Sequence, residues 1–204
     1  MEQKISKPAR ERLIRLSRLL EQQAKQGKEI ISSAEIQQHT GWTSFTVRRD
    51  ISMLNTSCSS PAGYTISSLL KAIQSELHMD TAEKKCCIVG LGRMGTALTG
   101  YSGFEKSAFT ISAGFDSSLN RTETLRAPFP LYTTTVMERI IKQEGIEYAI
   151  LAVPEHAAQE MALRLSACGI RGIVNYTSAI LRLPETTSVE NLSVIDALQN
   201  LASK

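Results

Sequence analysis

The residues with the clearest chemical meaning are three glycines in the pattern G-x-G-x-x-G. They directly follow an apolar run that ends at Val89, and a helix-prone segment begins at Thr96. In this context the first glycine permits a tight turn, the second lets a diphosphate approach the backbone, and the third lets the helix pack on the strand. The free N–H groups at the helix N-terminus favour phosphate. The predicted phosphate-binding turn is Gly90, Leu91, Gly92, Arg93, Met94 and Gly95.

An acidic residue stands at the spacing that a dinucleotide requires. The apolar run Phe109–Phe115 ends at Asp116, 21 residues after Gly95. An acid about 20 residues beyond the glycine turn accepts hydrogen bonds from ribose hydroxyls and repels a 2′-phosphate. The spacing therefore predicts NAD/NADH as the cofactor rather than NADP. The alternative is a structural glycine turn in a domain without a cofactor.

Two further apolar runs are predicted as strands of the same sheet, with helical segments between them. Ligands of parallel sheets bind beyond the carboxyl ends of the strands. We therefore expect Val153, Pro154, Asn175 and Thr177 to lie near the cofactor.

Other chemistry has weaker support. The four cysteines form no C-x-x-C pair and no histidine pair has a zinc spacing, so no metal site is predicted. Cys86 and Cys87 are adjacent in an apolar run and are predicted as strand core. An NAD-dependent dehydrogenase needs an acid/base near the nicotinamide. Of the three histidines only His156 follows a suitable strand end, and its position at a helix start favours a surface residue. No catalytic residue is therefore predicted.

The N-terminal part has the pattern of a helix-turn-helix. Apolar residues recur every three or four positions in a first helix, which is expected to end at Gly27. Ser32 and Glu35 form a capping box that opens a second helix. Thr40-Gly41 interrupts the helical pattern before a third helix that is predicted to run through Leu54. Two short helices joined by a glycine-containing turn are typical of this motif.

The third helix has a polar, cationic side opposite its apolar one. Ser44, Arg48 and Ser52 share that side, with Arg49 beside them. Arginine can contact guanine edges or phosphate, and hydroxyl groups can contact either. The pattern therefore predicts a DNA-recognition helix. The alternative is an ordinary solvated helix with two arginines.

A wing and a basic end support the same interpretation. Small turn residues that lead to Tyr64 predict a short hairpin, and an amphipathic helix follows. Residues 1–28 carry eight basic and three acidic side chains, although the whole chain has a net charge of only +3. This asymmetry suggests an anionic partner at that end, and a solvated helix face is the alternative.

The predicted fold class is α/β, with an N-terminal winged helix-turn-helix domain followed by a Rossmann-type parallel-sheet NAD-binding domain. The expected divisions are a DNA-binding domain at 1–78, a linker at 79–84, a cofactor domain at 85–192 and a terminal helix at 193–204. The apolar stripe of this last helix can pack on its own domain or on another subunit.

Taken together, these motifs resemble the Rex family of bacterial redox-sensing transcriptional repressors, nearly from end to end. The resemblance lies in Ser32–Glu35, Thr46–Ser52, Gly63-Tyr64, Ile88–Leu98, Phe115-Asp116, Leu151–Pro154, Ala157–Gln159 and Gly169–Thr177.

The resemblance implies a homodimer with a swapped C-terminal helix. It further implies NADH and NAD binding at the glycine turn, and a palindromic double-stranded operator that is released when NADH is high. It adds Thr46 and Tyr64 to the DNA contacts, and it places Arg93 with Asp116 and Pro154 at the cofactor. Arg18 and Tyr101 match two members of the family's switch network.

Two departures from the family pattern are visible. The family's wing is glycine-rich and basic after a Phe-Gly pair, whereas this chain has Leu54-Asn55 and a wing tip of Ser59-Ser60-Pro61. The family's acidic switch residue before the terminal helix is Ser193 here. Either Asp196 substitutes from one turn later, or redox control of DNA binding is weakened. Fewer cations weaken DNA binding. The alternative function is therefore a degenerate NAD-binding dimer with weak or lost DNA binding.

The cellular location is predicted from two negative features. The N-terminal residues contain no apolar signal region, and no apolar stretch approaches the roughly 20 residues of a membrane span. We therefore expect a cytoplasmic protein that makes no membrane contact.

Overall fold

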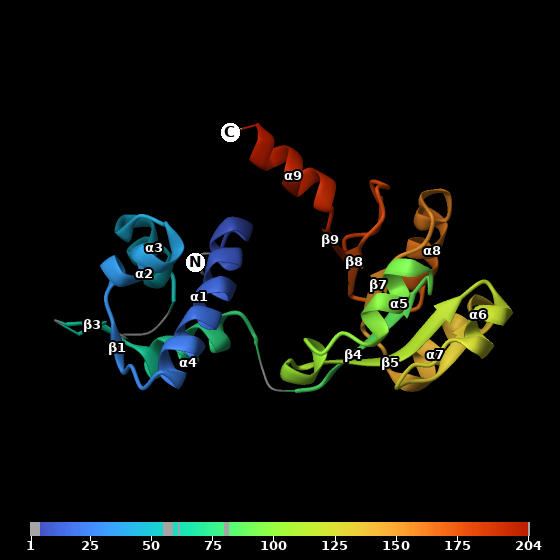
Figure 1. Cartoon of the computed structure of the whole chain (residues 1–204), viewed down its shortest axis with the longest axis horizontal. Coiled ribbons are helices and arrows are strands. Elements are labelled where there is room, and N and C mark those ends of the chain that lie inside the picture. Colours follow the sequence, from blue (N-terminus) through green and yellow to red (C-terminus); the bar gives the residue numbers. More distant parts are fainter. Residues whose placement is uncertain (1–4, 55–58, 61, 80–81, 204) are drawn as a thin grey trace. The chain divides into compact units, whose positions relative to one another are not determined.

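The structure is a computed structural model of the 204-residue chain. It describes residues 5–54, 59–60, 62–79 and 82–203 and divides into two compact units, Met1–Thr81 and Ala82–Lys204 (Figure 1). Several expectations for the wing and the linker lie outside the described residues, namely those for 55–58, 61, 80 and 81. Within the described ranges, no helix is both long and apolar enough to cross a membrane.

The first unit is a winged helix-turn-helix. β3 pairs antiparallel with both β1 and β2, in the order β1-β3-β2. The elements are α1 (Lys7–Lys25), β1 (Ile30–Ile31), α2 (Ser33–Thr40), α3 (Ser44–Ser52), β2 (Ser59–Ser60), β3 (Gly63–Thr65) and α4 (Ile66–Glu76).

Local residues set the ends of these helices. Ser32 and Glu35 form the predicted capping box at the start of α2, and Gly41 ends that helix at φ 74°. The prediction that α3 runs through Leu54 is wrong, because the helix ends at Ser52. The last amides bond to the carbonyl three residues back, including Leu54 to Ile51 at 3.0 Å, which tightens the turn. Leu54 is nevertheless buried in the core.

The second unit is a doubly wound α/β domain. Its strands are β4 (Lys84–Val89), β5 (Phe109–Asp116), β6 (Leu131–Thr133), β7 (Tyr148–Leu151), β8 (Gly172–Asn175) and β9 (Ser188–Asn191). Its helices are α5 (Arg93–Thr99), η1 (Phe104–Lys106), α6 (Leu119–Thr124), η2 (Thr134–Val136), α7 (Met137–Glu144), α8 (Glu155–Ala167) and α9 (Val194–Ala202). β4 therefore includes Lys84, the last residue of the expected linker.

All strand pairs in this sheet are parallel, in the order β6-β5-β4-β7-β8-β9. In chain order this is 3-2-1-4-5-6, the arrangement typical of dinucleotide-binding folds. The predicted fold class is confirmed. β6 and β9 have no counterpart in the sequence analysis, because they are short and are not continuously apolar.

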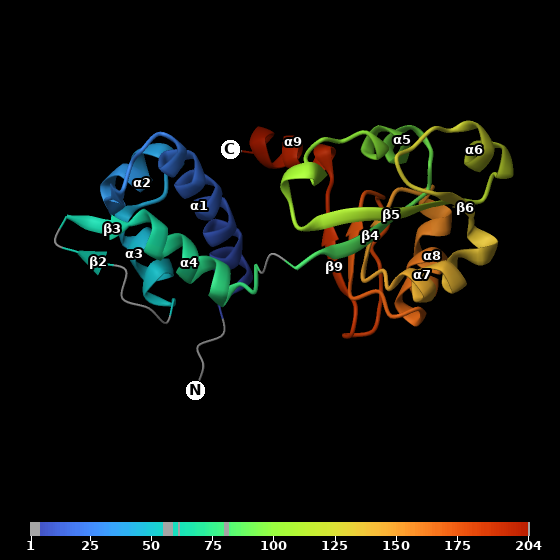
Figure 2. The ribbon, with the colours of Figure 1, turned by 90° about the horizontal axis from the view of Figure 1, so that it is seen from below.

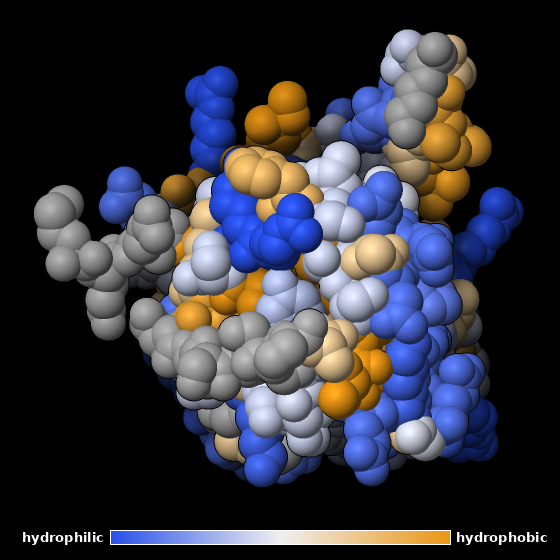
Figure 3. Space-filling model, turned by 90° about the vertical axis from the view of Figure 1, so that its left-hand side faces the viewer, coloured by the Kyte–Doolittle hydropathy of each residue, from blue (hydrophilic) through white to orange (hydrophobic). Residues whose placement is uncertain are grey.

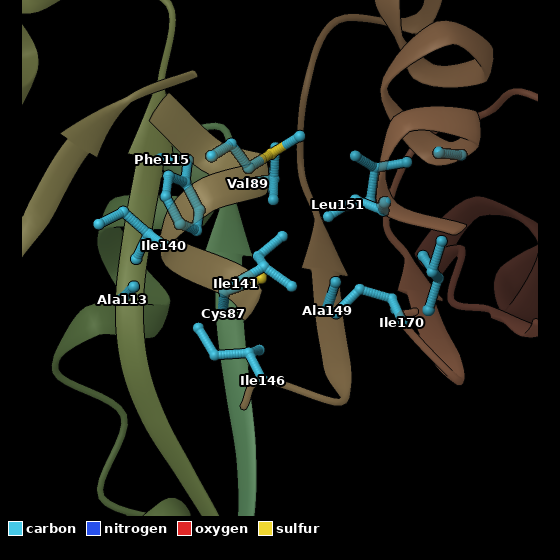
Figure 4. Packing of buried hydrophobic residues seen from close by; sticks show 14 of the residues in the cluster. Cys87, Val89, Ala113, Phe115, Ile140, Ile141, Ile146, Ala149, Leu151 and Ile170 are labelled. Carbon is cyan, nitrogen blue, oxygen red and sulfur yellow. The ribbon is translucent and has the colours of Figure 1, made fainter. Parts of the chain in front are cut away.

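Alternating residues of β4 supply two cores. Cys87 and Val89 face the cluster under α7 and α8 (Figure 4), whereas Cys86 and Ile88 face a smaller cluster that includes Leu98 of α5. Figure 2 shows α5 on one side of the sheet and α7 and α8 on the other. The two cysteines are core residues of a strand, as predicted.

The side of the sheet that carries α5 is only partly covered. No helix forms in residues 176–187, which connect β8 to β9. A pocket of about 350 Å³ lies over β7, β8 and β9 there, and its lining includes Phe104, Phe109, Tyr148 and Ile150. An apolar hollow of this kind on a sheet face is available for another apolar surface.

The capping box gives the first unit a predictable pH dependence. The hydrogen bond from Lys28, and then those from Ser32, lower the pKa of Glu35 from 4.5 to about 2. A lowered folded-state pKa means that this stabilisation is present above pH 4.5 and is lost as the pH falls towards 2. The effect is small because 39% of the Glu35 side chain is exposed.

We expect Glu35→Gln to lower the free energy of unfolding at pH 7 by about 0.5–1 kcal/mol. The wild-type and variant stabilities should converge as the pH falls from 4.5 to about 2. Trp42 is the only tryptophan and packs against the core of this unit, so its fluorescence during urea unfolding reports the transition. A constant difference between the two proteins across that pH range would contradict the assignment.

Candidate functional site

Two of the three glycines in the turn are required by steric contact. Gly90 has φ 93°, and a Cβ there would lie 2.5 Å from the carbonyl oxygen of Ala152. A Cβ on Gly95 would lie 1.8 Å from the carbonyl oxygen of Gly90. Helix α5 therefore approaches the end of β4 more closely than any side chain would allow.

Gly92 differs from its neighbours because nothing lies within 4 Å of the position its Cβ would take. It is the N-cap of α5, with φ −69°, and no side chain caps the helix there. The fold therefore does not require a glycine at this position. The open space beside the first amides of α5 is where a diphosphate would approach the backbone.

Asp116 ties the end of β5 to the glycine turn. Its carboxylate, only 3% exposed, accepts the Leu91 N–H at 2.7 Å and the Ser118 N–H at 2.8 Å. Arg121 Nη1 lies 3.3 Å from the same group. An ionised carboxylate can accept about four hydrogen bonds, so these three donors leave room for about one more.

A pocket of about 350 Å³ opens at the carboxyl ends of β4, β5 and β7. The strand order reverses between β4 and β7, and such switch points are where α/β sheets bind ligands. The lining residues are Gly90, Gly92, Asp116, Ser117, Arg121, Thr134, Ala152, Val153, Pro154, Ala157 and Met161.

The remaining predicted cofactor residues do not line this pocket. Leu91 and Gly95 are buried beside it, and Arg93 and Met94 are exposed in the first turn of α5. Asn175 is fully buried.

The amide of Asn175 is used within the protein. It donates to Asn191 on β9 at 2.9 Å and to the carbonyl of Ala179 at 3.0 Å, and it accepts from Thr177. Asn175 and Thr177 therefore shape the loop after β8.

Sequence reasoning missed Ser117, Arg121, Thr134, Ala152, Ala157 and Met161. Ala157 and Met161 stand four residues apart on one face of α8, a spacing that was readable from the sequence. Thr134 follows β6, a strand that has no clear pattern in the sequence and was therefore not predicted. Arg121 reaches the pocket from α6, the short helix that follows β5, and its ion pair with Asp116 has no sequence signal.

Other reactive groups are not poised for chemistry. Burial raises the pKa of Cys86 to about 12 and also raises the pKa values of Cys87 and Cys168, so these thiols stay protonated at neutral pH. His156 is exposed in the first turn of α8 and does not line the pocket. Among the described residues, no three His, Cys, Asp or Glu side chains form a group that could hold a metal ion.

The helix-turn-helix presents part of its predicted DNA face outward. Arg48, Arg49 and Ser52 are exposed on α3, and Arg48 Nη1 lies 3.2 Å from Ser33 Oγ on α2. Ser44 and Thr46 are only half-exposed. Figure 3 shows orange hydrophobic side chains at the surface of the first unit, between strongly hydrophilic ones.

An ion pair fixes α3 against α1. Arg12 Nε lies 2.5 Å from one carboxylate oxygen of Asp50, and Arg12 Nη2 lies 2.9 Å from the other. Asp50 is 3% exposed, and its hydrogen bond raises the pKa of Arg12. This planar, two-point contact sets the orientation of the recognition helix more tightly than apolar packing alone.

The other residues implied by the resemblance have the following local surroundings. Tyr64, in β3, is half-buried against the core of the first unit. Arg18 is exposed on α1. Tyr101 is also exposed, and its ring makes an edge-to-face contact with the ring of Phe104, with 5.6 Å between the ring centroids. Ser193 is the N-cap of α9 and accepts the Asp196 N–H at 3.0 Å.

A winged helix followed by a doubly wound parallel sheet with a glycine turn defines a class of two-domain proteins that join a DNA-binding fold to a dinucleotide-binding fold. Comparison with known proteins agrees. Residues 4–52 match a family described as putative DNA-binding protein N-terminus, and residues 81–179 match one described as CoA binding domain.

Full-length relatives identify the family. The redox-sensing transcriptional repressor Rex of Exiguobacterium sp. is 33% identical over 200 residues, which cover 98% of this chain and 91% of the relative. The chain therefore belongs to the Rex family of redox-sensing transcriptional repressors.

Solved structures of the Rex-family repressor RSP are similar throughout. Its complex with beta-NAD+ and operator DNA has a TM-score of 0.89 at 28% identity, covering 97% of this chain and 91% of that one. Its complex with beta-NADH has a TM-score of 0.86 at 28% identity, covering 98% and 93%.

We expect Arg12→Met to destabilise the first unit by about 3–5 kcal/mol, because the buried Asp50 carboxylate then keeps only the exposed Arg49, whose Nη2 lies 4.0 Å away. The double variant Arg12→Met/Asp50→Leu, which removes both charges, should recover to within about 1 kcal/mol of the wild type. Urea unfolding followed by Trp42 fluorescence measures both values. A loss below about 1 kcal/mol in the single variant would mean that the pair behaves as an exposed one.

Proposed function

We propose that this protein is an NAD(H)-responsive transcriptional repressor that binds a palindromic operator and releases it when NADH is high. It acts as a sensor in the cytoplasm and not as an enzyme. NAD and NADH bind in the pocket beside the glycine turn, and α3 reads the major groove.

The observation that carries the proposal is the open position of Gly92 beside the first amides of α5, in a chain of the Rex family. The two other glycines are explained by packing within the protein, whereas Gly92 is not. A diphosphate that approaches this backbone would explain why position 92 has no side chain. Asp116, Val153 and Pro154 border the same pocket and would face the rest of the dinucleotide.

The chemistry of the pocket favours sensing over turnover. His156, the histidine that follows the end of β7, is exposed and is not among the residues that line the pocket. The described thiols are protonated and therefore poor redox reagents. The redox signal then enters as the choice between two bound nucleotides. Such a signal changes operator affinity only if NADH and NAD favour different states of the protein.

The proposal predicts that Gly92→Ala weakens NADH binding at least about tenfold, since a methyl group would occupy the diphosphate approach. The fold should survive, with a melting temperature within about 4 °C of the wild type, because only a helix N-cap is altered. Isothermal titration with NADH, NAD and coenzyme A measures affinity. Fluorescence anisotropy on operator DNA measures release by NADH, which the variant should lose.

Gly95→Ala is the contrasting variant, because its methyl group would collide with the Gly90 carbonyl oxygen and should disrupt the fold itself. Unchanged NADH affinity in Gly92→Ala would refute the proposal that the diphosphate binds against the backbone at Gly92. Tighter binding of coenzyme A than of either nicotinamide dinucleotide would reassign the ligand. Equal operator affinity with NAD, with NADH and with no nucleotide would leave a DNA-binding protein without redox sensing.

One observation favours a second function, that of a nucleotide-binding relative with weak DNA binding. The sequence contains no Lys or Arg between Arg49 and Lys71, a stretch that includes the wing. A wing without cations releases fewer counterions from DNA. Operator binding that is absent even at low salt, together with normal NADH binding, would favour this function.

We also propose a homodimer in which α9 packs on the partner subunit. No residue of α9 is buried in the single chain, and Val194, Ile195, Leu198 and Leu201 are each at least 56% exposed. The uncovered apolar hollow over β7–β9 is a second surface that association would protect from water.

We expect Leu198→Glu to raise the dimer dissociation constant at least about tenfold, because it places a charge in an apolar contact. Gln199→Glu is the matched control, since it adds the same charge at the next position of α9 and should leave the dimer intact. Sedimentation equilibrium measures both. Equal dissociation constants for the wild type and Leu198→Glu would show that α9 is not the dimer contact.

A further inference from the structure

Helix α3, the proposed recognition helix, carries an exposed aromatic side chain among its polar residues. Phe45 stands in the first turn of α3 and is 68% exposed, against 39% for Ile30 and 37% for Met79. It is thus the most exposed large apolar side chain among the described residues of the first unit. Leaving a phenyl ring in water is unfavourable, so its exposed position suggests that the ring contacts a binding partner.

Phe45 lies on the outward face of α3. The buried residues of the helix are Val47, Asp50 and Ile51, which face the core. Phe45 precedes Arg49 by four positions and Ser52 by seven, so the three side chains share one stripe. All three are exposed.

The polar side chains on either side of Phe45 are held by the protein itself. Ser44 Oγ donates to Gln37 Oε1 at 2.8 Å, and Thr46 Oγ1 lies 2.9 Å from Thr43 Oγ1. The first bond holds the start of α3 against α2, and the second closes the N-terminal turn of α3 itself. In the first turn of the helix, the side chain left to meet a ligand is therefore the phenyl ring.

The major groove offers one apolar feature to such a ring. Among the base edges, only thymine presents a methyl group, and phenylalanine is one of the side chains that contact it. The N-terminal residues of a recognition helix are those that reach base edges. The neighbouring Arg49, four residues on, supplies the positive charge that draws this stripe onto DNA.

We propose that Phe45 is a specificity-determining residue that contacts the C5-methyl group of one thymine in each half-site of the operator. The inference rests on the proposed DNA-binding function and adds a base preference to it. Phe45 thereby supplies sequence discrimination, whereas Arg49 supplies attraction to the phosphates.

The experiment begins with selection of binding sites from a random double-stranded pool by the full chain in the presence of NAD. Each thymine of the selected duplex is then replaced singly by deoxyuridine, which removes only the methyl group. At one symmetric position, this replacement should weaken wild-type binding about fourfold, the value of one buried methyl group. The penalty should disappear in Phe45→Ala and persist in Phe45→Leu, which keeps an apolar contact.

Two controls separate this role from others. Leu163→Ala removes a side chain that is 45% exposed on α8 and should bind the selected duplex like the wild type. Arg49→Gln should lower the salt dependence of binding by about one charge per subunit, whereas Phe45→Ala should leave that slope unchanged. Trp42 fluorescence confirms that each variant is folded.

The outcomes are distinguishable. A pool that yields no enriched sequence would contradict the proposed DNA-binding function. An enriched sequence with no methyl-sensitive thymine, or a deoxyuridine penalty of equal size in Phe45→Ala, would overturn the inference while the function stands. Normal DNA binding by Phe45→Ala with a changed oligomeric state would assign the ring to a protein contact instead and overturn the inference as well.

Discussion

The approach of α5 to β4 is the constraint on which the cofactor domain depends. A helix whose third residue stands against the carbonyl of Gly90 can start only where no Cβ intervenes, and the two packed glycines make that possible. This contact fixes where the amides of α5 point. It also leaves Gly92 over open space, so one local requirement of packing produces the concave backbone that a diphosphate needs. Asp116 then secures the turn from the neighbouring strand through the Leu91 N–H.

In the winged helix, different residues fix the position of α3 and form its outward surface. Arg12 and Asp50 hold α3 from the side of α1, and Gln37 with Ser44 holds its start from the side of α2. The outward stripe is therefore carried by a helix whose direction is set at two separate points. A rigid presentation of this kind limits the entropy lost when side chains meet a base edge.

Much of this organisation could be predicted from the sequence, and there are physical reasons why the rest could not. The capping box and the strand–turn–helix at the glycines follow local rules, so their spacing predicted these structural features correctly. Asp116 stands at the end of β5, and its contact with a ribose stays a prediction. β6 and β9 were missed because short strands that are not continuously apolar lack a periodic signal. Asn175 illustrates a harder case: its position at a strand end predicted a ligand contact, whereas its amide bonds to Asn191 across to β9. Which partner a polar group takes depends on tertiary contacts that no sequence spacing records.

The bonds of Asp116 have a consequence for the speed of the response. Because the carboxylate already accepts two backbone amides of the chain, the turn owes its shape to the protein and not to whatever nucleotide occupies it. Replacing one nucleotide by another then requires no reordering of the loop, and the exchange time is set by how fast the outgoing molecule leaves. In the proposed function, such a pocket responds to a changed ratio of NADH to NAD as fast as the bound nucleotide dissociates.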